Sequence, residues 1–135
     1  MRLDPKAEGL RWLEQAEQDL ADARYLLTGK RYHLVCFLAQ QAAEKAVKGF
    51  LYAQGLEWVR GHSVADLARA AAEFNASFKA LVPVGGNLDR HYVPTRYPNA
   101  LPGGIPSQAF DIEDAQKALE QAQHILNFVH PMIES

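Results

Sequence analysis

The chain has 135 residues, of which 48% are apolar and 22% are charged, the ordinary balance of a soluble globular domain. Its net charge of −2 argues against a generic nucleic-acid coat protein, which would be strongly basic. The single cysteine, Cys36, cannot form an internal disulfide, and we find neither an N-terminal leader nor a long apolar run. We therefore expect one domain over residues 1–135, cytoplasmic and without a membrane partner.

The charges are distributed unevenly along the chain. Residues 24–96 hold ten basic and five acidic side chains, a net of +5. Residues 1–23 hold three basic and six acidic side chains, a net of −3, and residues 97–135 hold one and five, a net of −4. Either the acidic flanks neutralise the middle within or between subunits, or the middle presents a positive surface to an anionic ligand.

Two long helices are predicted in the first half of the chain. Apolar residues three and four positions apart predict a helix from about Pro5 to Leu27, stopped by Gly29. Its acidic residues, including Asp19, are expected on a solvated face. A second helix is predicted from about Arg31 to Gln54, closed by Gly55, and its alanines permit a neighbouring helix to approach closely.

Shorter elements are expected in the middle of the chain. Ser63 is a good cap for a third helix from Val64 to about Phe74. A short helix around Phe78 to Val82 should follow, then a loop at Gly85-Gly86-Asn87 and a helical turn over Leu88 to Tyr92.

A long irregular segment is predicted before the last helix. Residues 93–110 contain four prolines and two glycines, which exclude a regular helix and predict a crossover loop of a length usually kept for function. Asp111 should cap a last helix that begins at Ile112 and that Pro131 ends or kinks. No strand pattern occurs, so the predicted fold is all-α: an antiparallel up-and-down helical bundle of about five helices, with a Pro/Gly-rich loop before the last one.

The second predicted helix carries a polar stripe of four residues: Gln41, Glu44, Lys45 and Lys48. These side chains fall within roughly 100° of one another on a helical wheel. The stripe is either a solvated face stabilised by a Glu44–Lys48 pair, or the lining of a cleft in which an amide and two ammonium groups bind phosphate.

A second unusual string, residues 90–99, combines arginines with tyrosines. Such residues can contact phosphate and stack on a base, and the prolines between them lower the entropy lost on binding. The alternative is that the tyrosines plug the end of the bundle while Arg96 pairs with an acidic helix. The candidate ligand-binding residues of the chain are Gln41, Lys45, Lys48, Arg90, Tyr92, Arg96 and Tyr97. No metal site or cofactor is predicted, because His33 and Cys36 alone do not make a zinc site.

The order and spacing of several motifs are similar to those of a known family. Gln40-Gln41-Ala-Ala-Glu44-Lys45-Ala-Val-Lys48, then His62-Ser63, then Thr95-Arg96-Tyr97-Pro98 resemble the HEPN domain over nearly the whole chain. The resemblance implies a bundle of about five helices that forms homodimers or larger homo-oligomers. It also implies a partner, a minimal nucleotidyltransferase, in a two-component or toxin–antitoxin pair.

The resemblance further implies a site in many members, but this chain departs from it. Many HEPN proteins are metal-independent ribonucleases in which an arginine is followed four to six residues later by a histidine. Here Arg31 precedes His33 by two positions, Arg60 precedes His62 by two, and Arg90 adjoins His91. The ribonuclease spacing is therefore absent.

Three hypotheses for function follow. We favour a non-catalytic protein that binds a nucleotide, or presents a substrate, to a separate nucleotidyltransferase. The first alternative is a metal-independent RNA endonuclease whose atypical site uses His91 or His62 with Arg90 or Arg96. The second is a structural homo-oligomer whose last helix makes the interface.

Overall fold

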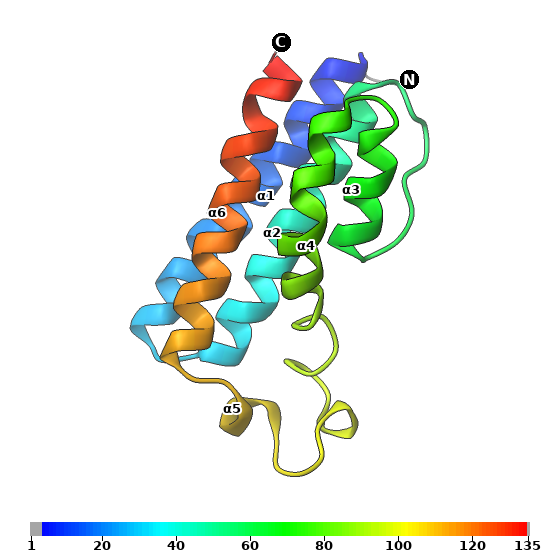
Figure 1. Cartoon of the computed structure of the whole chain (residues 1–135). Helices are drawn as coiled ribbons and strands as arrows, with labels where there is room; N and C mark the ends of the chain where they lie inside the picture. The colour runs from blue at the N-terminus through cyan, green and yellow to red at the C-terminus, as the bar shows by residue number, and fades with distance from the viewer. Residues whose placement is uncertain (1–3, 135) are drawn as a thin grey trace.

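The computed structural model describes residues 4–134 and forms an all-α bundle (Figure 1). Three long helices and two shorter ones build it: α1 (Pro5–Thr28), α2 (Tyr32–Ala53), α3 (Val64–Ala72), α4 (Val82–Asp89) and α6 (Ile112–Glu134). Short helical segments complete it: η1 (Ala76–Leu81), η2 (Pro98–Ala100) and α5 (Pro106–Ala109). The predicted fold class is confirmed. None of the helices described has both the length and the apolar character needed to span a membrane.

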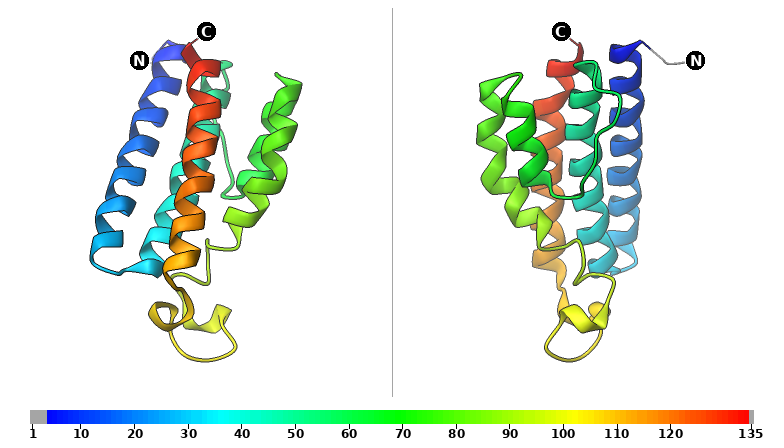
Figure 2. Two further views of the ribbon diagram at one scale, coloured as in Figure 1. Left: turned by 60° about the vertical axis from the view of Figure 1, so that its left-hand side comes forward. Right: turned by 90° about the vertical axis from the view of Figure 1, so that its right-hand side faces the viewer.

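The connection between α2 and α3 sets the direction of the two shorter helices. Residues 54–63 leave the end of α2 and return along the outside of the bundle, so α3 runs parallel to α2 and α4 runs back against both (Figures 1 and 2). The beginning of α3 and the end of α4 therefore meet beside the middle of α2. The loop from α4 to α6 projects beyond one end of the bundle, and the beginning of α1 and the end of α6 lie together at the other end (Figure 1).

Small residues allow α1 and α2 to pack at very short range. Gly9 and Gly49 face each other, and a Cβ built on Gly49 would lie only 2.8 Å from the carbonyl oxygen of Gly9. The predicted close-packing alanines of α2 are fully buried: Ala39, Ala42, Ala43 and Ala46. The composition of α2 is thus explained by its central position, in contact with α1 on one side and α6 on another.

The prediction of a loop at Gly85-Gly86-Asn87 is wrong, because these residues lie inside α4. Gly85 is needed there for packing, since a Cβ at this position would lie 2.9 Å from Cγ1 of Val64 and 3.0 Å from the amide nitrogen of Ala65. Glycine has a low intrinsic helix propensity, but at position 85 its missing side chain allows α4 to approach the first turn of α3. The chain then continues through a turn at residues 90–92.

The last helix does not end at Pro131, one of the two predicted outcomes, since α6 continues through the proline to Glu134. Proline removes one backbone hydrogen bond, and the burial of Ile133, which is 3% exposed, favours continuing the helix.

The predicted caps are confirmed: the Asp114 amide donates to Oδ1 of Asp111 at 2.9 Å, and the Asp66 amide donates to Oγ of Ser63 at 3.1 Å.

Candidate ligand-binding site

The loop after α4 forms a cluster of one arginine and three aromatic rings, which we call the Arg96 cluster: Phe37, Tyr92, Arg96 and Tyr97. The Arg96 guanidinium lies 4.5 Å from the ring centroids of Phe37 and Tyr92 and 5.1 Å from that of Tyr97. Its Nε donates to the Tyr92 carbonyl at 2.8 Å. No carboxylate of residues 4–134 forms an ion pair with Arg96, so the predicted alternative of pairing with an acidic helix is wrong.

The sequence Thr95-Arg96-Tyr97 explains how the loop holds this arginine. Thr95 is 1% exposed, and its hydroxyl donates to the carbonyl of His91. The amides of Arg96 and Tyr97 both donate to the carbonyl of Val93, at 3.0 and 3.1 Å. Three bonds therefore fold the loop back on itself. Tyr97 remains 51% exposed and does not plug the bundle.

His62 extends the Arg96 cluster on the other side of Tyr92. The two rings are stacked, with centroids 4.8 Å apart and an interplanar angle of 17°. Nδ1 of His62 lies 3.4 Å from the carboxylate of Glu44, and the histidine side chain is 60% exposed. The sequence predicted His62 only for the alternative ribonuclease, and its one signal was the His62-Ser63 motif.

The Glu44–Lys48 pair forms, although it is not on a solvated face. Lys48 Nζ lies 3.2 Å from Glu44, with side-chain exposures of 9% and 5%. Gln41 also donates to Glu44 at 3.3 Å, and Trp12 of α1 lies over the lysine, with its ring centroid 5.9 Å from Nζ. Because the charge of Lys48 is already neutralised and enclosed, it is a weaker candidate for binding phosphate than Arg96.

Lys45 is paired with α1. Its ammonium donates to Asp19, which is 5% exposed and also accepts from Gln15 at 2.8 Å. The expectation of a solvated Asp19 is wrong, because Lys45 crosses from α2 and covers it. Lys45 borders a groove of about 480 Å³ together with Arg11, Trp12 and Gln15.

The seven candidate residues thus fall into two groups. Tyr92, Arg96 and Tyr97 form the Arg96 cluster, and Gln41 and Lys48 are both linked to it through Glu44 and His62. The other two, Lys45 and Arg90, lie outside it. Arg90 is exposed where α4 ends.

His91, one of the two histidines that the ribonuclease alternative uses, is only partly exposed. It packs edge-on against Phe110 at 5.6 Å, and its Nδ1 is buried with no hydrogen-bond partner in the part of the chain that the structure describes. Burial lowers the pKa of His91, which disfavours the imidazolium. His62 is therefore the better placed of the two histidines.

Residues 4–134 contain neither a group of metal ligands nor an exposed thiol. Within residues 4–134 no three His, Cys, Asp or Glu side chains are grouped as metal ligands. Cys36 is buried, and desolvation, aided by Asp114 and Asp111, raises its pKa to about 12. Burial also lowers the pKa of His33, one helical turn away, with a smaller contribution from Arg31.

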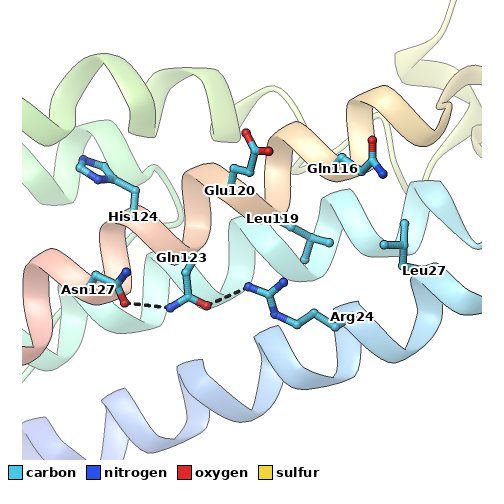
Figure 3. Close-up of a pocket in the computed structure, with 8 residues that line it drawn as sticks. All are labelled: Arg24, Leu27, Gln116, Leu119, Glu120, Gln123, His124 and Asn127. Carbon is cyan, nitrogen blue, oxygen red and sulfur yellow. Dashed lines mark hydrogen bonds between the residues drawn. The ribbon is translucent and has the colours of Figure 1, made fainter.

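A second groove, of about 640 Å³, lies between α1 and α6 (Figure 3). Arg24 donates to Gln123 at 2.8 Å, and Gln123 donates to Asn127 at 2.9 Å, so polar side chains cross-link the two helices. None of the candidate residues lines it.

Leu119 is 4% exposed and belongs to the core of the chain itself, which accounts for the heptad spacing of α6 without an interface.

Comparison with known proteins identifies the family of the chain and agrees with its all-α fold. The family model described as HEPN domain matches residues 10–132. The curated protein "Putative toxin MJ1304" of Methanocaldococcus jannaschii is 30% identical over 132 residues, covering 91% of this chain and 86% of the relative. Two solved structures are each 40% identical and cover 93% of this chain and 98% of theirs: TT1696 from Thermus thermophilus, TM-score 0.87, and ST0689, an archaeal HEPN homologue, TM-score 0.76.

Proposed function

Because the chain belongs to the HEPN domain family, we propose that it binds a nucleotide, or a substrate carrying one, at the Arg96 cluster and acts with a separate minimal nucleotidyltransferase. The observation that carries this proposal is the arginine itself. Its guanidinium is held between rings and by one bond from Nε, without a carboxylate partner among residues 4–134.

The chemistry of the cluster suits a phosphate joined to a base. A guanidinium presents several N–H donors in one plane, which can bind two phosphate oxygens at once. Its stacking on the aromatic rings keeps these donors oriented in the ligand-free protein. Tyr97 is half-exposed and can stack on a base, while the exposed imidazole of His62 supplies a second polar group beside Tyr92. The net charge of +5 over residues 24–96 favours an anionic ligand.

The toxin–antitoxin role proposed for this chain rests on its sequence similarity to a relative and on its family. A relative that is 30% identical to this chain over 132 residues is named "Putative toxin MJ1304", and the family resemblance implies a nucleotidyltransferase as the second component. In this pair the chain is the binding component, in keeping with its lack of the ribonuclease spacing. We also propose that it assembles as a homodimer or larger homo-oligomer, which sedimentation of the pure chain and co-elution with the transferase would test.

Calorimetric titration tests the binding proposal. ATP, GTP and a short single-stranded RNA are titrated into the wild type at low and moderate salt, with saturable binding expected for at least one ligand. Arg96→Ala should weaken that binding by about tenfold or more, since a charge-assisted bond contributes roughly 1.5–3 kcal/mol. Arg69→Ala is the matched control, because Arg69 is exposed and paired with Asp66 on α3. Equal affinity of Arg96→Ala and Arg69→Ala would refute the site.

One observation favours a second candidate function, an RNA endonuclease. Glu44 and Nδ1 of His62 are 3.4 Å apart, and His62 and Arg96 contact the same tyrosine ring. A carboxylate that orients an imidazole can prepare it for proton transfer, while an arginine stabilises a phosphate. This candidate requires cleavage that persists in chelator, is lost in His62→Ala and survives in His91→Ala. Cleavage that survives in His62→Ala would exclude it.

A further inference from the structure

The His62 ring contacts Tyr92 and the Glu44 carboxylate, and the backbone around His62 determines whether the ring can reach both. His62 lies at the end of the exposed segment 54–63, directly after Gly61, which has a φ of +102°. Earlier in this segment, the Val59 amide donates to the Tyr52 hydroxyl at 3.2 Å. A segment of this kind does not by itself hold an imidazole flat against Tyr92, so the neighbouring bonds decide where the ring lies.

Asp89, the last residue of α4, makes most of those bonds. Its carboxylate accepts from the Ser63 hydroxyl at 2.8 Å and from the amides of Val64 and Ala65 at 2.7 and 3.1 Å. These are the three residues that follow His62, and they form the first turn of α3, where a negative charge is favoured by the helix dipole. Asp89 thereby fixes the chain immediately after His62.

Gln40 completes the attachment from α2. It is fully buried, and its Nε2 donates to the carbonyl of His62 at 2.7 Å and also lies 3.3 Å from Oδ1 of Asp89. Its own Oε1 accepts from Gln41 at 2.9 Å. A buried amide whose donor and acceptor are both used has one allowed orientation, so the backbone of His62 is held on this side as well.

Asp89 also fixes the other half of the stack. Its backbone carbonyl accepts from the amide of Tyr92 at 3.2 Å, and the carbonyl of Tyr92 in turn accepts from Nε of Arg96. One residue therefore holds the chain directly after His62 through its side chain, and at Tyr92 through its backbone. The imidazole, the tyrosine ring and the guanidinium are arranged around this single position.

We propose that Asp89 is the positioning residue of the Arg96 cluster, which holds His62 on Tyr92 and thereby sets the affinity for the ligand. The proposal has two halves, which are measured separately. The first half, that Asp89 holds His62 on Tyr92, does not depend on any ligand. The second half, that Asp89 sets the affinity for the ligand, rests on the proposed function.

NMR of the histidine ring protons tests the first half. Stacking on Tyr92 shifts the His62 signals upfield, and His62→Asn identifies them by their loss. Asp89→Asn should return these signals toward the position of an unstacked histidine. Asp111→Asn is the matched control: it alters an aspartate that caps a different helix, α6, through the Asp114 amide, and should leave the His62 signals unchanged. A merely structural role for Asp89 would lower stability without moving His62.

A second variant covers the case in which Asp89→Asn does not fold. Gln40→Met keeps the volume of the side chain but removes the bond to the His62 carbonyl, and the same loss of the upfield shift is expected. His62 signals that stay in place in the folded variants would overturn the inference.

Titration with ATP, or with whichever of GTP and the short RNA the wild type binds, tests the second half. Asp89→Asn should bind about tenfold to 100-fold more weakly, by analogy with the loss found in metal sites when residues that orient the ligating side chains are replaced. Unchanged affinity would overturn this half. A shift that is lost in Asp89→Asn while the wild type binds no ligand would refute the proposed function and leave the positioning role standing.

Discussion

Replacing Lys48 with methionine tests whether the buried lysine belongs to the fold or to the ligand site. Its ammonium lies 3.2 Å from Glu44, and the two side chains are 9% and 5% exposed. Methionine fills a similar volume but leaves the Glu44 carboxylate buried without its cation. Removing one member of a buried pair costs about 3–5 kcal/mol. Glu44 keeps contacts with Gln41 and His62, so we expect the lower end of that range.

The expected loss of about 3 kcal/mol corresponds to a fall in thermal midpoint of roughly 6–12 °C. Far-ultraviolet circular dichroism during heating measures it, with Lys79→Met as the control because Lys79 is exposed in η1. The double variant Glu44→Met, Lys48→Met should recover most of the loss, since it removes both charges together. A Lys48→Met protein that melts with the wild type would refute the structural role that we assign to this pair.

Three further predictions concern packing and protonation. Gly49→Ala should lower the free energy of unfolding by about 1–3 kcal/mol in chemical denaturation, because its Cβ would meet the Gly9 carbonyl, whereas Gly86→Ala, with no atom within 4 Å, should not. Burial lowers the pKa of His91, so the unfolded chain binds the proton first, and stability should fall as pH drops below 6.5. Burial lowers the pKa of His33 as well, so His91→Leu should reduce this pH dependence without abolishing it, and an unchanged slope would contradict the reasoning. Cys36 should resist a thiol reagent in the native protein and react after denaturation, and rapid native labelling would disprove its burial.

The sequence predicts the helices well where local chemistry decides them. Ser63 and Asp111 cap helices because a side-chain oxygen next to a free amide is a local interaction. The sequence-based prediction fails where a contact with a segment distant in the chain determines the local structure. Gly85 breaks a helix by propensity, yet it lies within α4 because α3 approaches it, and that contact is not visible in the neighbouring residues.

The candidate site divides in the same manner. The Thr95-Arg96-Tyr97 string is contiguous, and its arginine and tyrosines can be singled out from sequence. The burial of Asp19 depends on Lys45, which belongs to another helix. Glu44 pairs with Lys48 on its own helix, and both are buried because other segments cover that side of α2. Asp89, which holds His62 through residues 63–65, is separated from them by a whole helical hairpin, and no local pattern distinguishes it from a solvated aspartate.

The most direct test of the central claim is to map the ligand on the protein by NMR. During titration with ATP, GTP or the short RNA, we predict that the largest shift changes fall on Nε of Arg96 and on the rings of His62, Tyr92 and Tyr97. Changes confined to the groove between α1 and α6, or no changes at saturating ligand, would contradict the claim that the Arg96 cluster is the binding site.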